Sequence, residues 1–147
     1  MLRNARPVAF LATADSAQAR SFYEGLLELR LLADEEFALV FELGATTLRI
    51  AKVGELTPQP FTVFGWVTED VDATVSELSA RGVTFQRFGE LEQDELAIWT
   101  APSGARVAWF KDPDGNLLSL STQNPFPLWG GLGGGLQRPG PTWRPSA

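Results

Sequence analysis

Histidine and cysteine are both absent from the 147-residue sequence. Without imidazole or thiolate, the usual tetrahedral zinc sites cannot form, and catalysis by a histidine base is excluded. A site for a hard cation, built from oxygen ligands alone, is the only common kind of metal site left. Disulfides are excluded as well, which fits a reducing compartment.

The chain also has few basic residues and no long apolar run. It carries 12 Lys and Arg against 18 Asp and Glu, a formal net charge of −6, and no basic cluster. Nucleic-acid binding needs such a cluster, so we expect no nucleic-acid partner. No apolar run approaches the roughly 18 residues of a membrane helix, and residues 1–7 are too short and polar for a secretory signal. We therefore expect no membrane partner and a cytoplasmic location.

Hydrophobic residues are plentiful, at 44% of the chain with 10 Phe and 5 Trp, which is enough for the core of one domain. Two stretches follow the same plan. In the first, the apolar residues 8–13 precede Asp15 or Ser16, which are suitable helix N-caps, and an amphipathic helix is expected to run to Leu29. In the second, the apolar residues 61–67 lead into a helix that should end before Gly82.

The spacing of equivalent positions indicates a duplication. Asp15 and Asp70, or alternatively Asp72, stand at the two expected helix starts, and Asp70 follows Asp15 by 55 positions, the same interval as between Val8 and Val63. Further strands are expected at 31–32, 38–43 and 46–53 in the first half, and at 84–88, 96–100, 106–110 and 117–121 in the second. The sequence thus predicts an α+β fold of two tandem βαβββ modules, at residues 1–56 and 57–123. A generic α+β sandwich is the alternative.

The stretch 124–147 differs from both halves because it is rich in Gly and Pro, which disfavours helix and strand. We expect a solvated tail. The alternative is a docking segment for a neighbouring subunit or a pocket, since the tail contains Phe126, Leu128, Trp129 and Trp143.

Three segments carry a resemblance. Residues 12–15 are followed by the pair Phe22 and Tyr23; residues 66–72 run into 78–83; and residues 110–116 read FKDPDGN. Together they resemble the vicinal oxygen chelate superfamily of glyoxalases, extradiol dioxygenases and fosfomycin or bleomycin resistance proteins, over about residues 6–123. Glu28 departs from the pattern, because the family usually has Gly at that helix end.

The resemblance implies that each module curls into a cup whose interior holds a divalent metal ion bound by His or Glu. The corresponding positions here are Val8 and Val63 on the first strands, and Arg49 and Ser119 on the last strands. Valine has no lone pair and guanidinium is a permanent cation without an acceptor. We therefore predict a branch of the family that lacks the metal ligands, with no metal ion and no cofactor.

The same assignments and strand alternation predict a largely apolar cup lining with one cation and several hydroxyls. Its residues are Val8, Phe10, Thr47, Arg49, Ala51, Val63, Gly65, Leu117, Ser119 and Ser121. Arg49 is the most informative of them, because a buried guanidinium needs an anionic ligand or an internal carboxylate. The alternative places Arg49 on an edge strand in contact with solvent, or pairs it with Glu42.

No catalytic pair is evident in the sequence, and the candidates for catalysis are Arg49, as an oxyanion stabiliser, and Tyr23, as an acid or base. The acidic stretch 90–95 could supply a general base, although a solvated loop is the alternative. Three functions follow: a metal-independent protein that binds a small, possibly anionic, organic molecule as bleomycin-resistance-like proteins do; a cofactor-free lyase, isomerase or cyclase; or an interaction module that uses the tail. We also expect a homodimer, as relatives commonly pair modules across one.

Overall fold

The structure is a computed structural model that describes residues 1–122, so the expected tail at 124–147 lies outside the described residues. The chain divides into two compact units. The first contains Met1–Gln59 together with Lys111–Asn116, and the second contains Pro60–Phe110 and the residues from Leu117 onward. Each unit is built around one four-stranded mixed sheet and one helix, which gives an α+β fold of two βαβββ modules, as the sequence predicts.

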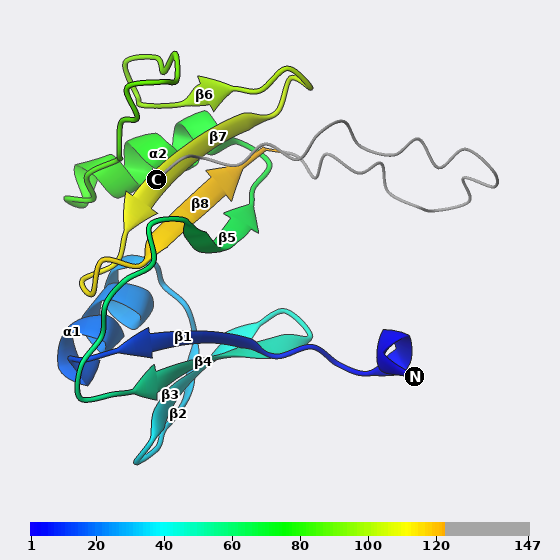
Figure 1. The fold of residues 1–147 in the computed structure, drawn as a ribbon, viewed down its shortest axis with the longest axis vertical. Helices are drawn as coiled ribbons and strands as arrows, with labels where there is room; N and C mark the ends of the chain where they lie inside the picture. The colour runs from blue at the N-terminus through cyan, green and yellow to red at the C-terminus, as the bar shows by residue number, and fades with distance from the viewer. Residues whose placement is uncertain (123–147) are drawn as a thin grey trace. The chain divides into compact units, whose positions relative to one another are not determined.

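The first module follows a short 3-10 turn, η1 (Leu2–Asn4) (Figure 1). Its elements are β1 (Ala9–Thr13), α1 (Ser16–Arg20) with its π-helical continuation η2 (Ser21–Leu26), β2 (Leu31–Asp34), β3 (Ala38–Leu43) and β4 (Thr46–Lys52). The strand order is β1-β4-β3-β2, with β1 parallel to β4 and the other neighbours antiparallel. The expected strand at 31–32 is therefore longer, and the other strands of this half lie where the sequence predicts them.

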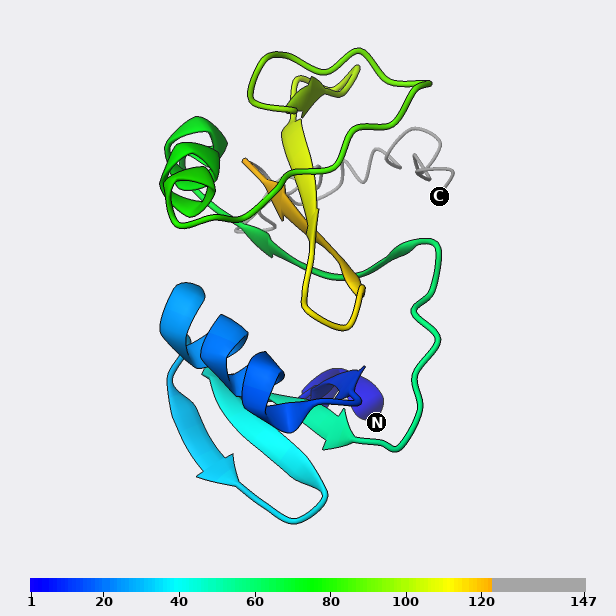
Figure 2. The same cartoon turned by 90° about the vertical axis from the view of Figure 1, so that its left-hand side faces the viewer.

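The two faces of this sheet differ most at β1, because β3 is buried on both faces: Val40, in the same row as Phe10, is 7% exposed. Leu11 is buried and in register with Ile50, and the ring of Tyr23 on η2 lies 5.9 Å from that of Phe41, so this face packs under the helix (Figure 2). Phe10, one residue from Leu11, is 66% exposed. We name the face that carries Phe10 the open face of the first sheet.

The second module repeats the plan with β5 (Thr62–Val67), α2 (Val71–Ala80), β6 (Trp99–Thr100), β7 (Arg106–Lys111) and β8 (Leu117–Ser121). The strand order is β5-β8-β7-β6, with β5 parallel to β8. Val71 and Val75 of α2 are fully buried, and the indole of Trp66 stacks on Phe110 with ring centroids 6.3 Å apart. Figure 2 shows α2 against one face of this sheet.

The ends of both helices follow from single residues. Asp15 caps α1 through its carboxylate, which accepts a hydrogen bond from the amide of Gln18, and Asp70 caps α2 in the same way from the amide of Ala73. The first helical stretch was expected to reach Leu29, but it turns earlier because Glu28 has a φ of +61°, a left-handed conformation that usually favours glycine.

The strand expected at 84–88 is not formed, and this prediction is wrong. Only Phe85 makes a bridge, to Phe110. The side chain of Gln93 provides the physical reason: its carbonyl accepts from the amide of Phe88, while its amide donates to the carbonyls of Gln86 and Ala97. One side chain therefore satisfies backbone groups that a strand partner would otherwise bind, and the strand expected at 96–100 shrinks to the two residues of β6.

Candidate functional site

The open face of the first sheet carries most of the predicted lining residues of the first half. Phe10 is in register with Arg49, and Ala12 with Ala51, across the parallel pair β1 and β4. The side chain of Phe10 is largely exposed, whereas Ala51 is half-buried. A large apolar ring, small alkyl groups and one guanidinium thus lie side by side on two neighbouring strands.

Arg49 makes an ion pair with Glu35, a residue that no sequence pattern singles out. Its guanidinium donates to the carboxylate of Glu35, 3.0 Å away, in the turn between β2 and β3. Glu42, the partner suggested by the sequence, instead lies 3.5 Å from Arg30, and β4 is an inner strand of the sheet and not an edge. Both side chains of the Arg49–Glu35 pair are partly exposed, at 36% and 50%, so the pair stabilises the fold by at most about 1 kcal/mol.

A hollow of about 350 Å³ lies at the end of this unit where the turn joins β3 to β4. Two predicted lining residues, Val8 and Thr47, contribute to it. The other residues were not predicted from the sequence: Arg6, Leu32, Glu42, Gly44, Ala45 and Thr46. The only sequence pattern that could have located them is the alternation of inward and outward side chains along β2, β3 and β4. A bulge between Leu31 and Ala33 interrupts this alternation in β2.

The remaining predicted lining residues belong to the second unit. Gly65 is in register with Ser119, and Val67 with Ser121. A Cβ added to Gly65 would collide with the Oγ of Ser119 and approach its carbonyl oxygen to 2.9 Å, so glycine is required by close packing. Val63 is half-buried, and Leu117 is buried at 4% exposure.

Tyr23 is fully buried in the first unit. Its hydroxyl donates to Oδ2 of Asp112 over 2.6 Å, and the same oxygen accepts from the Asn116 amide over 2.8 Å. The other oxygen of Asp112 accepts from the backbone amides of Asp114 and Asn116. Burial first, and then the negative charge of Asp112, raises the pKa of Tyr23, so the phenol keeps its proton. This arrangement fixes the 111–116 turn and leaves Tyr23 without access to solvent.

Asp94 in the acidic loop 90–95 holds the loop in place by accepting hydrogen bonds. Although partial burial opposes the effect, hydrogen bonds from the amides of Ile98 and Leu96 and the nearby Arg106 guanidinium lower the pKa of Asp94. A carboxylate with a lowered pKa that already accepts these bonds is a poor general base.

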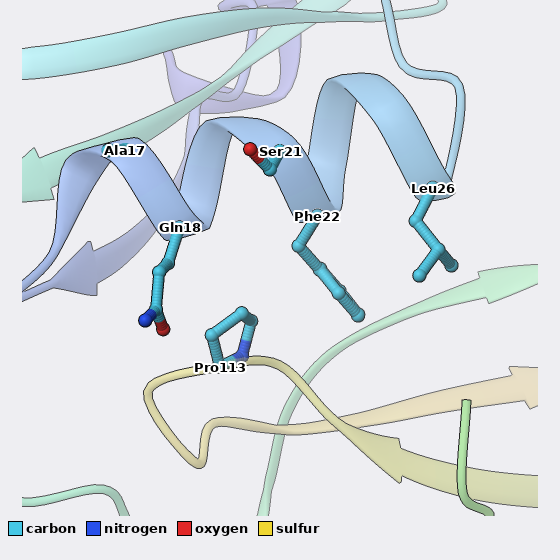
Figure 3. Close-up of a pocket in the computed structure, with 6 residues that line it drawn as sticks. All are labelled: Ala17, Gln18, Ser21, Phe22, Leu26 and Pro113. Atoms are coloured by element: carbon cyan, nitrogen blue, oxygen red, sulfur yellow. The ribbon is translucent and has the colours of Figure 1, made fainter. Parts of the chain in front are cut away.

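A second hollow, of about 440 Å³, lies along the helix of the first unit. Figure 3 shows the side chains of Gln18 and Phe22 directed toward Pro113. Its lining consists of Ala17, Gln18, Ser21, Phe22, Leu26 and Pro113. It has no ionisable group and none of the predicted lining residues, so it offers apolar contact without groups for acid or base chemistry.

The comparisons with known proteins agree with this architecture. Residues 6–120 match the Glyoxalase/Bleomycin resistance protein/Dioxygenase superfamily. The chain belongs to this superfamily. No curated protein matches the sequence significantly.

Several solved structures are similar to this chain over most of its length. A lactoylglutathione lyase from Agrobacterium tumefaciens has a TM-score of 0.64 at 16% identity, covering 81% of this chain and 93% of that one. A glyoxalase/bleomycin resistance protein from Catenulispora acidiphila has 0.60 at 24%, covering 81% and 98%. The oxidase ChaP-H2 has 0.61 at 25%, covering 80% and 91%. These names describe different activities, so superfamily membership establishes the fold and leaves the reaction open.

The four positions that the superfamily resemblance assigns to a divalent metal do not fit one in this chain. The side chains of Val8 and Arg49 in the first unit offer no electron pair to a cation. In the second unit Val63 offers none either, and only the hydroxyl of Ser119 could act as a ligand. Among residues 1–122, no three acidic side chains gather where a metal ion could be held. In the same part of the chain, no helix is long and apolar enough to cross a membrane.

Proposed function

We propose that the protein binds a small organic molecule, without a metal ion, on the open face of the first sheet. The observation that carries this proposal is the exposure of Phe10, at 66%, as the second residue of β1, although the next residue, Leu11, is in the core. Val8 and Leu32 on the rim of the adjacent hollow are also exposed, at 44% and 47%. Contiguous exposed apolar groups mark ligand or partner surfaces in folded proteins.

The chemistry of the charged groups favours binding over catalysis. Arg49 is neutralised by Glu35, and Tyr23 is buried with its proton held by Asp112. General acid or base catalysis needs a group whose pKa is matched to the reaction and whose proton the substrate can reach. Val8 and Arg49 occupy positions where the family resemblance places metal ligands, and neither can bind a metal ion. A ligand held beside them would rely on shape, apolar contact and a few polar groups, which also favours binding over catalysis.

A thermal-shift screen of small carboxylic acids, neutral aromatics and glycopeptide antibiotics tests the proposal. A ligand that binds only the native state stabilises it and so raises the melting temperature. At a ligand concentration of one hundred times Kd, the stabilisation is about 2.7 kcal/mol. We expect at least one chemical class to raise it in a concentration-dependent way. If no compound shifts the transition, the proposal is wrong for these classes.

Two variants locate the binding. Phe10→Ala should weaken the binding of the compounds found, because it removes the exposed ring from the open face. Phe37→Ala is the matched control: Phe37 is 74% exposed but lies in the turn between β2 and β3. Equal losses in both variants would argue against the open face. One tightly bound divalent ion per purified chain, measured by elemental analysis, would contradict the metal-free part of the proposal.

A further inference from the structure

Two arginines stand near the proposed binding surface, and they differ in their partners. Arg49 is held by Glu35 at 3.0 Å. Arg6 lines the hollow beside Val8 and has no ion pair or side-chain hydrogen bond to any residue among the first 122. An incoming anion would have to displace Glu35 from Arg49, whereas at Arg6 there is no ion pair for it to break. Arg6 is therefore the better anchor for a negative charge.

The rest of the hollow limits what the anion can be. Its apolar wall is formed by Val8 and Leu32, both partly exposed, while the hydroxyl of Thr46 already donates to the carbonyl of Pro7. Glu42 stands in the same lining and shares the weak ion pair with Arg30, at 3.5 Å. A carboxylate in the lining repels multiply charged groups such as phosphate more strongly than a single negative charge. The hollow thus suits one singly charged group attached to a hydrocarbon.

Size narrows the class further. A volume of about 350 Å³ is at the lower end of the roughly 300–1,000 Å³ of small-molecule sites. Guanidinium binds carboxylates through paired, charge-assisted hydrogen bonds, which neutral amides cannot reproduce. Replacing a carboxylate by an amide of the same shape therefore isolates the contribution of the cation.

We infer that Arg6, and not Arg49, holds the ligand, and that the ligand is a small monocarboxylate whose apolar body packs against Val8 and Leu32. This inference rests on the proposed function and names the ligand class for the hollow next to the open face, which shares Val8 with that face. Arg6 is thus a binding and specificity residue, although no sequence motif marks it.

Calorimetric titration with two matched pairs of probes tests the inference: phenylacetate against phenylacetamide, and indole-3-acetate against indole-3-acetamide. The unmodified protein should bind each acid at least tenfold more tightly than its amide. Arg6→Gln should abolish this preference and leave the amide affinity unchanged, and Arg6→Lys should restore part of it. Arg3→Gln is the control, since Arg3 is a second exposed arginine of the same segment that does not line the hollow.

The outcomes separate the two proposals. If acids and amides bind equally, or if Arg49→Gln and not Arg6→Gln abolishes the preference, the inference is overturned while binding at the open face stands. The same holds if Arg3→Gln acts like Arg6→Gln, because the effect is then general electrostatic attraction. If none of the four probes binds, the inference fails directly, and the wider thermal-shift screen decides the proposed function.

Discussion

The two modules have the same order of strands and helix, but they differ in the strand at one edge of the sheet, β2 or β6. In the first, the four-residue strand β2 pairs with β3. In the second, β6 has only two residues, and a loop organised by Gln93 takes up the chain between α2 and β6. Both helices nevertheless begin at an Asp cap, Asp15 or Asp70, after a strand parallel to the last strand of its module. The cap and the parallel pair are therefore the constant parts of the module, and the second strand is variable.

The exposed faces differ as well. The first sheet presents Phe10 and the Arg49–Glu35 pair, whereas β5 and β8 approach so closely that Gly65 leaves no room for a side chain beside Ser119. A repeated backbone thus carries two unlike surfaces. The first sheet offers an exposed aromatic ring near an ion pair, whereas the second combines the close Gly65–Ser119 contact with the exposed Val67 on the same strand.

The largest effect should come from the buried carboxylate of the first unit. Asp112→Ala leaves the Tyr23 hydroxyl, the Asn116 amide and two backbone amides without their acceptor. Each buried polar group without a partner costs about 1–3 kcal/mol, so we expect the free energy of unfolding to fall by about 3–5 kcal/mol. Urea denaturation measures the loss.

Hydrogen exchange followed by mass spectrometry sharpens the comparison between the units. In Asp112→Ala, peptides from β1, β3 and β4 should lose more protection than peptides from α2. Asp114→Ala is the control in the same turn, because it removes only the bonds to the Thr13 hydroxyl and the Ala14 amide at a less buried position, for about 1 kcal/mol. Equal losses in the two variants would contradict the central role of Asp112.

A smaller effect is expected in the second unit. Gly65→Ala forces β5 and β8 apart, because the new methyl group meets both the side chain and the carbonyl of Ser119. We expect a loss of about 1–3 kcal/mol in urea denaturation, as for other overpacked sites. Gly25→Ala is the matched control, since an added Cβ there meets no atom within 4 Å and alanine favours helix. A neutral Gly65→Ala would show that the strands separate without cost.

The sequence predicts the parts of this fold that are governed by local rules. Alternation located β3, β4, β7 and β8, and the Asp caps located both helix starts. It failed at residues 84–88, because the hydrogen bonds that replace a strand there come from the side chain of Gln93, whose role depends on tertiary position. Glu28 in a left-handed conformation shows a similar limit at a helix end.

The candidate site was less accessible to sequence reasoning than the fold. Strand alternation placed Phe10 and Arg49 on one face, but pairing Arg49 with Glu35 depends on how the β2–β3 turn folds back over β4. The lining of the hollow comes from three separate segments: Arg6 and Val8 before β1, Leu32 at a bulge, and the hairpin residues 42–47. Tertiary packing brings these residues together, and their spacing along the sequence does not predict it.

The smallest effect is a pH dependence that should distinguish the two units. Tyr23 is the only tyrosine of the chain, and its buried contact with Asp112 raises its pKa above the ordinary value near 10. The folded state therefore binds this proton more tightly than the unfolded state, so the stabilisation is complete below about pH 10 and is lost as the pH rises above it. The expected loss is about 1.4 kcal/mol for each pH unit above 10. Absorbance at 295 nm should show tyrosinate appearing only as the protein unfolds, and Tyr23→Phe should lack this component of the alkaline destabilisation. A tyrosine that titrates near pH 10 in the folded protein would mean that the first unit opens its core to solvent, and the contrast with the second unit would then rest on the exposed faces alone.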